Sequence, residues 1–452
     1  MAGNHENHGL LLAGAILLLT LLLVFDLRRR RKKYGGLTLN PPPGPWQLPV
    51  IGSMHHVVGA LPHRAMRDLA LRHGPLMLLR MGELPVVVAS SAAAAREVMK
   101  THDAAFASRP RTNTFATLTK DGLGVALAPL GDHWRRVRKL CATELLGAPR
   151  VRSFRWTREA EAAALVASVT AAAAFGDVVN VSSLVTTYVV DAVVRVMVGD
   201  RITDREAFLA CLDEAVRVAA GFSLADLFPS SRLARALSRT ARRVEAVFGE
   251  MSRLMDTVIK EKRARKAAGV GREEEEDILD VLLDGGGDGV PLSIETVRAM
   301  MRDLFGAGSE TSASTLLWAM AELMREPAAL RRAQAEVRGA LAGQSRVREE
   351  SLQELPYLRL FRPERFEEGA VAALDFRGTD FELVPFGAGR RMCPGITFGL
   401  AVIELALASL LFHFDWELPG GTTELDMAEA LGITAKRKSD LWLHATVIIP
   451  PL

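Results

Sequence analysis

The sequence predicts a mainly α-helical protein with a minor β part. Alanine-rich amphipathic stretches with helical spacing occur at residues 62–73, 92–100, 157–174 and 233–266. One longer helical pattern covers residues 293–325, and the clearest strand signal is a pair of apolar runs, 76–81 and 86–89, typical of a hairpin. The hydrophobic content of 49% excludes a disordered chain, and 37 Gly and 21 Pro in 452 residues exclude a fibrous repeat.

The N-terminus predicts a membrane anchor. Residues 9–25 carry no charged side chain, and as a helix they would extend about 25 Å, near the lower limit for crossing a bilayer. A secretory signal peptide places its positive charges before such a run, whereas here residues 28–33 are all Arg or Lys and follow it. We therefore expect an uncleaved anchor, with a cleaved signal as the alternative, and a globular part on the cytosolic side.

Prolines mark the boundary after this anchor. Residues 41–45 read Pro-Pro-Pro-Gly-Pro, which favours an extended, semi-rigid spacer. The spacer is either an ordinary linker or a hinge that sets how the globular part meets the membrane. The predicted organisation is an anchor with its basic flank (1–33), a proline-rich hinge (34–52) and one globular domain (53–452).

Charge and cysteine content limit the function classes. The formal charge of +3 comes from the anchor flank, because residues 1–33 carry a net +4 and the rest of the chain sums to −1. A nucleic-acid-binding surface is therefore not expected. Three cysteines in 452 residues cannot form a disulfide framework, which indicates a reducing compartment.

Two polar segments have simple structural interpretations. Residues 260–266 and 272–277 are charged, and we expect a solvated helix end and loop there. Residues 285–289 are rich in glycine and predict a flexible turn before the next helix. They lack the spacing and the preceding strand of a dinucleotide-binding loop.

The long helix predicted from Ser293, its N-cap, to Arg325 contains an anomaly at residues 305–312. Two glycines in a helix interior each cost up to about 1 kcal/mol relative to alanine. Small residues permit close helix packing, which is one explanation. The other is a flat ligand against this face with a local opening of the helix, where Glu310 and Thr311 supply an acid and an alcohol.

Cys393 lies in a loop that suits a thiolate ligand or nucleophile. Glycines in residues 385–395 let the backbone bend close to a ligand, and the loop leads into an apolar helix, 396–412. A helix N-terminus and a neighbouring Arg391 favour the charged form of a thiol. A reactive cysteine and a metal site both remain open, but a zinc site would need three more ligands at suitable spacing.

These residues resemble the haem-binding loop of the cytochromes P450. The family pattern F-x-x-G-x-R-x-C-x-G is filled by Phe386, Gly389, Arg391, Cys393 and Gly395. Residues 307–311 resemble the family's oxygen-activating motif, 134–138 its W-x-x-x-R helix and 361–366 its P-E-R-F segment. The resemblance covers essentially the whole chain and is nearest to plant A-type microsomal members. It implies a cytochrome P450-like single haem domain behind an N-terminal transmembrane helix.

The resemblance implies a monooxygenase that contains haem b. Cys393 would be the axial thiolate, which favours O–O cleavage. Trp134, Arg138 and Arg391 would hold the haem propionates. Trp134 and Arg138 also fit an ordinary amphipathic surface helix.

Other residues near this site have implied roles or none. Glu310 and Thr311 would relay protons during dioxygen activation. Phe386 would pack against the thiolate side of the haem. Cys141 and Cys211 have no comparable surroundings and are expected to be small core residues.

The implied partners are a reductase, dioxygen, membrane lipid and a small apolar substrate. No flavin or nicotinamide motif is visible, so electrons would come from an NADPH-dependent cytochrome P450 reductase on the endoplasmic reticulum membrane. Arg135, Arg136 and Lys139 would attract an acidic partner, or are simply solvated. The segments comparable to substrate-contacting regions are mostly apolar, and by analogy they suggest a terpenoid or another specialised metabolite: residues 111–128, 219–228, 305–309 and 431–434.

One departure from the family lies between Leu360 and Phe361. The family has a helix with an E-x-x-R motif and several strands at this place, whereas here residues 355–360 run directly into the P-E-R-F segment. Arg365 would lose its charge partners, at a cost of several kcal/mol. An internal deletion, by splicing or by an error in the gene model, is expected. The alternative function is a membrane-anchored, catalytically silent form with impaired haem binding; an isomerase that needs no reductase is disfavoured by Glu310 and Thr311.

Overall fold

The computed structural model describes residues 40–110, 112–119, 123–174, 176–200, 202–219, 223–269, 276–286, 290–360, 376–421 and 424–451. The predicted anchor, its basic flank and the start of the hinge lie outside these residues. So do Arg111, residues 220–222 and 287–289, and the segment 361–366 with Arg365. The domain boundaries predicted from the sequence therefore stay predictions.

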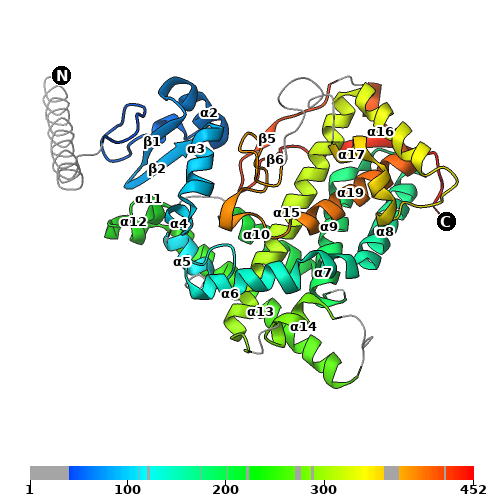
Figure 1. The fold of residues 1–452 in the computed structure, drawn as a ribbon, viewed down its shortest axis with the longest axis horizontal. Coiled ribbons are helices and arrows are strands. Elements are labelled where there is room, and N and C mark those ends of the chain that lie inside the picture. Colours follow the sequence, from blue (N-terminus) through cyan, green and yellow to red (C-terminus); the bar gives the residue numbers. More distant parts are fainter. Residues whose placement is uncertain are drawn as a thin grey trace, which may run out of the picture. The chain divides into compact units, whose positions relative to one another are not determined.

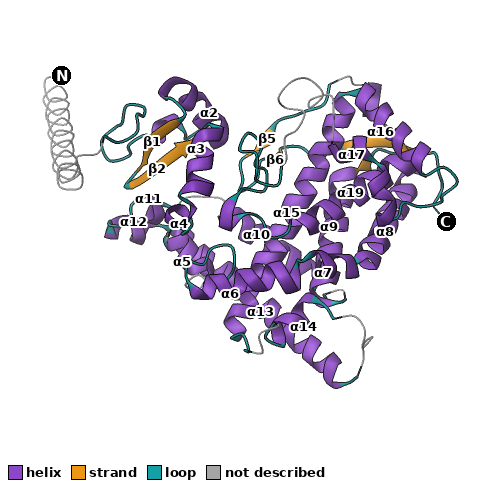
Figure 2. Ribbon diagram, viewed as in Figure 1, coloured by secondary structure: helices purple, strands orange, loops and turns teal. Residues whose placement is uncertain are grey.

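Helices dominate the described residues, as predicted (Figures 1 and 2). The α-helices are α2 (Pro62–His73), α3 (Ala92–Arg96), α4 (Asp103–Phe106), α5 (Asn113–Thr119), α6 (Asp132–Leu140), α7 (Ala148–Ser153), α8 (Arg155–Ala173), α9 (Val181–Val198), α10 (Arg205–Ala219), α11 (Leu224–Leu227), α12 (Arg232–Leu237), α13 (Arg239–Ala267), α14 (Ile278–Leu283), α15 (Ile294–Arg325), α16 (Pro327–Ala340), α17 (Pro356–Leu360) and α19 (Ile396–His413). The strands are β1 (Leu76–Met81), β2 (Leu84–Ala89), β3 (Val179–Asn180), β4 (Phe414–Glu417), β5 (Glu429–Ala430), β6 (Lys436–Arg437) and β7 (Trp442–Val447).

The chain divides into two compact units. The first contains the described residues up to Thr101 together with Ser223–Ser238, and the second contains His102–Phe222 and Arg239–Leu452 as far as they are described. In the first unit β1 and β2 pair as the predicted antiparallel hairpin. Alternate residues of β1, Met77 and Leu79, pack with Leu69 and Ala70 of α2 in a small core.

The second unit is built around α15. This helix lies against α9 and α19, and α8 packs on both α9 and α19. Ser293 caps it by accepting a hydrogen bond from the Thr296 amide, so the predicted N-terminus is confirmed. By length and composition α9 and α19 are apolar enough to cross a membrane, but most of each is buried within the fold. Among the described helices, therefore, the two most apolar ones are core elements.

Small sheets complete the second unit. β7 lies between β3 and β4 and is antiparallel to both. β5 and β6 form a separate antiparallel pair, and the turn between them contains residues 431–435. With the β1–β2 hairpin of the first unit, the predicted minor β part of the described residues is thus distributed over three small sheets.

Two helix predictions need correction. The stretch 233–266 is not one helix, because Ser238 has an extended backbone that separates α12 from α13. Serine competes for backbone hydrogen bonds and is a poor helix interior residue. The stretch 92–100 begins as α3 but continues as a π-helical turn, Glu97–Thr101.

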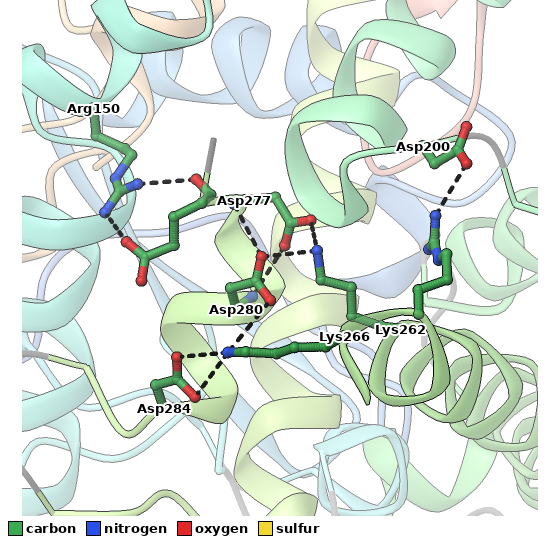
Figure 3. A network of polar contacts seen from close by, with 9 residues as sticks. Arg150, Asp200, Lys262, Lys266, Asp277, Asp280 and Asp284 are labelled. Atoms are coloured by element: carbon green, nitrogen blue, oxygen red, sulfur yellow. Dashed lines mark hydrogen bonds and ion pairs between the residues drawn. The ribbon is translucent and has the colours of Figure 1, made fainter. Parts of the chain in front are cut away.

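The charged segment at the end of α13 is largely exposed, as predicted, with one exception. Lys262 is not solvated: its ammonium contacts Asp277 and lies 2.7 Å from Asp280 Oδ2, and its side chain is only 16% exposed (Figure 3). Asp277 is the N-cap of α14, and Asp280 completes its capping box. Lys266, one turn later, is exposed and pairs with Asp284. The pattern of alternating charges did not reveal that one lysine and two aspartates are buried together.

Candidate functional site

The Cys393 loop is held by its own backbone. Gly387 and Gly389 have φ angles of +69° and +66°, where a side chain would be strained. The Cys393 amide donates to the Phe386 carbonyl at 2.9 Å, which closes the loop. The Cys393 thiol is exposed, and α19 begins three residues later at Ile396. The structure therefore presents one accessible thiol beside a helix N-terminus, as the sequence predicted.

Helix α19 connects this loop to α15. Gly399, one turn into α19, lies so close to α15 that a Cβ atom there would be 3.8 Å from Ser312 Oγ. Ser312 follows Glu310 and Thr311 directly in the sequence. Packing of α19 against α15 therefore brings the cysteine loop and the predicted acid–alcohol pair to neighbouring parts of the fold.

Arg391 is directed at the backbone of two other segments. Its Nε donates to the Ala107 carbonyl at 2.8 Å, and its Nη atoms donate to the carbonyls of Val125 and Ala128. Its guanidinium carbon lies 4.3 Å from the ring centroid of Trp134. This stacking orients the guanidinium and joins α6 to the cysteine loop.

Trp134 and Arg138 lie on the same helix, α6. Trp134 is buried, and its indole N–H donates to the Val125 carbonyl at 3.2 Å. Arg138 donates to the carbonyl of Met392, next to Cys393. Arg138, rather than Arg391, is thus the arginine hydrogen-bonded to the residue before the thiol. The structure brings Trp134, Arg138, Arg391 and Cys393 together.

The arginines of this group lack an acidic partner among the described residues. Burial, together with the charges of Arg109 and Arg138, lowers the pKa of Arg391 to about 10. Burial also lowers the pKa of Arg138, although the charges of Cys141 and Cys393 oppose this. Across the described ranges, no carboxylate forms an ion pair with Arg109, Arg138 or Arg391. Three crowded guanidinium groups without a carboxylate are suited to an anionic ligand.

A buried carboxyl organises the loop that carries these carbonyls. Asp303 of α15 accepts a hydrogen bond from the Ala126 amide at 2.8 Å. Burial raises the pKa of Asp303 to about 6, against the hydrogen bonds from the Ala126 and Val125 amides. A Cβ on Gly124 would be 2.2 Å from Asp303 Oδ2, so only glycine fits there. Asp303 therefore orients the segment that contains Val125. The Val125 carbonyl accepts hydrogen bonds from both Trp134 and Arg391.

One face of α15 is accessible in the middle of this core helix. Ala307, Thr311 and Thr315 are exposed at four-residue spacing, while neighbours such as Phe305 and Ser309 are buried. Of the two explanations left open for residues 305–312, the local opening is not seen, because α15 is continuous from Ile294 to Arg325. Instead the Thr311 hydroxyl donates to the Ala307 carbonyl at 2.5 Å, within the intact helix.

The two glycines of this face have different roles. A Cβ on Gly308 would be 3.3 Å from Val193 of α9, so this glycine permits close helix packing. A Cβ on Gly306 would meet no atom within 4 Å. Helix packing therefore explains Gly308 but leaves Gly306 without a packing reason.

Glu310 is held from outside the helix. Its Oε1 accepts a hydrogen bond of 2.7 Å from the hydroxyl of Thr434, in the turn between β5 and β6. Sequence reasoning placed Thr434 in a substrate-contacting segment but gave it no role. It also missed Arg109 and Asp303, because nothing in their local sequence indicates which loop they contact.

The remaining predicted residues lie as follows. Phe386 is half-buried, and its ring centroid is 6.1 Å from that of Phe376. Gly395 lies at the start of α19, where a Cβ would be 3.9 Å from Cys393 Sγ. Cys141 and Cys211 are buried core residues, as expected. Burial raises the pKa of Cys141 to about 12, so it is not a candidate thiolate.

The basic residues of α6 outside this group face solvent or neighbouring loops. Arg135 and Lys139 are exposed, and Arg135 pairs with Asp132. Arg136 donates to the Val290 carbonyl. Among the described residues, no three His, Cys, Asp or Glu side chains gather as they would around a metal ion.

Comparison with known proteins identifies relatives along the whole chain. The family model "Cytochrome P450" matches residues 41–361 and 359–443. The chain is 40% identical to desmethyl-deoxy-podophyllotoxin synthase of Sinopodophyllum hexandrum, over 90% of this chain and 92% of the relative. It is 38% identical to premnaspirodiene oxygenase of Hyoscyamus muticus, over 90% of this chain and 93% of the relative.

A solved structure has the same fold. A zebra fish cytochrome P450 determined with progesterone superposes with a TM-score of 0.69 at 20% identity, covering 86% of this chain and all of that one. The two family matches meet at residues 359–361. The alignment with the Sinopodophyllum enzyme extends over 473 positions, more than the 452 residues of this chain. The relative therefore has residues without a counterpart here.

Proposed function

Because the chain belongs to the cytochrome P450 family, we propose that Cys393 is the thiolate ligand of its haem iron in a plant A-type monooxygenase. The family and fold imply haem b with cysteine thiolate ligation. The observation that carries the assignment is the exposed Cys393 thiol beside a cluster of arginines that has no acidic partner among the described residues. The other two cysteines are buried in the core.

The residues present suit this cofactor. The guanidinium groups of Arg138 and Arg391, and of Arg109 beside them, would hold the propionates by charge-assisted hydrogen bonds. The indole N–H of Trp134, now bonded to Val125, is a further donor on the same side. When bound, thiolate-ligated haem supplies the oxidising chemistry that activates dioxygen and transfers one oxygen atom to the substrate.

The loop prepares Cys393 for ligation. Positive φ angles at Gly387 and Gly389 turn the backbone, and the bond from the Cys393 amide to the Phe386 carbonyl fixes the turn. The N-terminus of α19 follows Cys393, and Arg138 donates to the Met392 carbonyl directly before it. These contacts orient the thiol before any cofactor binds.

Glu310 and Thr311 would move the protons that dioxygen activation consumes. Thr311 lies on the accessible face of α15, and Glu310 is held by Thr434. The Thr311 hydroxyl donates to the Ala307 carbonyl, which leaves its oxygen lone pairs as proton acceptors. A carboxylic acid beside an alcohol is suited to proton transfer from solvent to an enclosed site.

The substrate proposed is a small apolar molecule, a terpenoid or a similar specialised metabolite. Ala307 of α15 and Leu431 and Ile433 of the β5–β6 turn are exposed, and Thr434 of the same turn bonds to Glu310. A relative at 38% identity is named premnaspirodiene oxygenase. Apolar walls with few polar groups select substrates by shape.

Electrons would come from an NADPH-dependent reductase on the endoplasmic reticulum membrane. Arg135 and Lys139 of α6 are exposed, and their helix also carries Trp134 and Arg138. Positive charge on this helix would guide an acidic partner toward the cofactor side. The predicted anchor at residues 9–25 would hold both proteins on the same membrane.

The alternative is a catalytically silent form. The E-x-x-R region that the resemblance leads us to expect would lie between Leu360 and Phe361, where the two family matches meet. Without it, by the resemblance, Arg365 would lose its charge partners, and an unpaired buried charge costs several kcal/mol of stability. We propose an internal deletion at this junction.

A reduced, carbon-monoxide difference spectrum of the full chain tests the proposal. A red-shifted, thiolate-type band is expected, and it should vanish in Cys393→Ser but persist in Cys211→Ala, which changes a core cysteine. An absent or inactive-type band in the parent chain would exclude the monooxygenase function for this form. Inserting the corresponding segment of premnaspirodiene oxygenase between Leu360 and Phe361 should then restore the band.

A further inference from the structure

The turn between β5 and β6 is attached to α15 at two points. The Thr434 hydroxyl donates to Glu310 Oε1 at 2.7 Å, and the Trp318 indole donates to the Ala435 carbonyl at 2.7 Å. Glu310 and Trp318 are eight residues apart, which is about 12 Å along a helix. Two adjacent residues of the turn therefore span two turns of α15.

The second attachment is reinforced from β6. The guanidinium carbon of Arg437 lies 5.6 Å from the Trp318 ring centroid, and Arg437 is buried. Its Nη1 contacts Sδ of Met427, which lies two residues before β5, at 3.6 Å. Trp318 and Arg437 thus fix the C-terminal end of the turn, so the position of Thr434 is defined independently of Glu310.

The first attachment acts on the proposed proton relay. A hydroxyl that donates to a carboxylate forms a charge-assisted bond and restricts the carboxylate's rotation. Within the part of the chain that the structure describes, Glu310 Oε2 has no hydrogen bond, so Oε2 is the oxygen left to exchange protons. Glu310 is on the helix, but its orientation depends on a residue 124 positions later in the chain.

The same turn carries exposed apolar side chains. Leu431 is 71% exposed and Ile433 is 58% exposed, and they are the neighbours of Thr434 along the turn. A molecule that packs on these side chains must touch the segment that holds Glu310. The turn is therefore placed to sense an apolar ligand and to act on the acid at the same time.

We propose that Thr434 is a positioning residue for Glu310, and that it couples occupancy of the 431–434 turn to the orientation of the proton-donating carboxyl. The inference rests on the proposed monooxygenase function for its catalytic meaning, although the attachment itself does not require haem. Thr434→Val removes the hydroxyl at nearly constant volume, and Thr434→Ser restores it. Thr257→Val is the control for the same change elsewhere, since the Thr257 hydroxyl donates only within its own helix, to the Arg253 carbonyl of α13 at 3.2 Å.

Hydrogen exchange of the full chain tests the attachment. Loss of one hydrogen bond to a charged group should raise amide exchange across residues 428–437 about tenfold in Thr434→Val. Thr434→Ser and Thr257→Val should leave that segment unchanged. Glu310→Ala should give the same increase, and the double variant no more, because both changes remove one bond. Unchanged exchange in Thr434→Val, or additive effects in the double variant, would overturn the proposal.

Turnover tests the positioning role. The ratio of product formed to NADPH consumed should fall about fivefold in Thr434→Val, as expected for losing one positioning bond, with KM nearly unchanged and with recovery in Thr434→Ser. A role confined to stability would leave this ratio unchanged, and that result would overturn the proposal. A chain without a thiolate-type spectrum contradicts the proposed function, and the exchange measurement then decides the attachment by itself.

Discussion

Replacing Lys262 with Met should destabilise the second unit strongly and in a pH-dependent way. Lys262 is the shared partner of Asp277 and Asp280, whose side chains are 3% and 12% exposed. Burial lowers the pKa of Lys262, but the hydrogen bonds to both carboxylates outweigh it and the net shift is upward. The lysine is therefore charged in the folded protein. Its removal leaves two carboxylates close together, with the exposed Lys266 ammonium 4.0 Å from Asp280 Oδ1 but without the short contacts that Lys262 makes to both.

The size of the effect follows from burial. Breaking a buried ion pair by removing one partner costs about 3–5 kcal/mol in the free energy of unfolding. Lys266→Met is the matched control on the same helix, because Lys266 is 60% exposed and pairs with the exposed Asp284. A surface substitution of this kind changes stability by about 0.5 kcal/mol or less.

The pH dependence has a definite sign. Burial raises the pKa of Asp277 from 3.8 to about 6 in the folded protein. Folding therefore favours the neutral carboxyl. Its contribution to the free energy of unfolding is fully present below pH 3.8 and is lost as the pH rises through about 6. Without Lys262 the neutral form is favoured still more. The decrease in the free energy of unfolding caused by Lys262→Met should be largest above pH 7 and less than half as large at pH 5.

Urea denaturation at pH 5.0 and 7.5, followed by circular dichroism, measures both effects. The midpoint of Lys262→Met should fall well below that of the parent chain at pH 7.5 and approach it at pH 5.0. Equal losses in Lys262→Met and Lys266→Met at pH 7.5 would refute the buried network. So would a loss that grows on acidification.

Three further predictions concern the site and the core. Gly124→Ala should lower haem retention, measured as haem per chain after desalting, because its Cβ would be 2.2 Å from Asp303 Oδ2 and must displace either that carboxyl or the loop that the carboxyl holds; unchanged retention would contradict that role for the loop. Arg391→Lys should also lower haem retention, since one ammonium cannot bond to the three carbonyls that the guanidinium reaches; a retention equal to that of the parent would exclude a propionate role for Arg391. Tyr188→Phe should lower the free energy of unfolding by about 1–2 kcal/mol, because the buried Val402 carbonyl loses a donor at 2.9 Å; no change in the urea midpoint would count against this bond.

The core elements were predictable because they depend on local signals. α2 and β1 have their predicted limits, and α15 begins at the predicted cap Ser293. Hydrophobic periodicity and N-cap chemistry act within a few residues, so a sequence shows them directly. The break at Ser238 was missed because a single polar residue is a weak signal against 34 residues of helical pattern.

The cysteine loop was also predictable, because its residues are adjacent in the chain. Gly387, Gly389 and Cys393 form one turn whose chemistry needs no distant partner. The residues around Glu310 left packing and a local opening as alternatives. The structure shows no opening, since the hydroxyl of Thr311 bonds to the Ala307 carbonyl within an intact helix. Composition cannot distinguish a helix that opens from one that merely presents an accessible face.

The sequence by itself determined the helical fold class, the thiol loop and the acid–alcohol pair, because each is encoded in a short stretch of chain. Only the tertiary structure decided what surrounds them. Arg138 reaches Met392 across 254 positions, Asp303 reaches Ala126 across 177, and Thr434 reaches Glu310 across 124. Such contacts depend on how α15, α6 and the β5–β6 turn pack, and no local pattern carries that information.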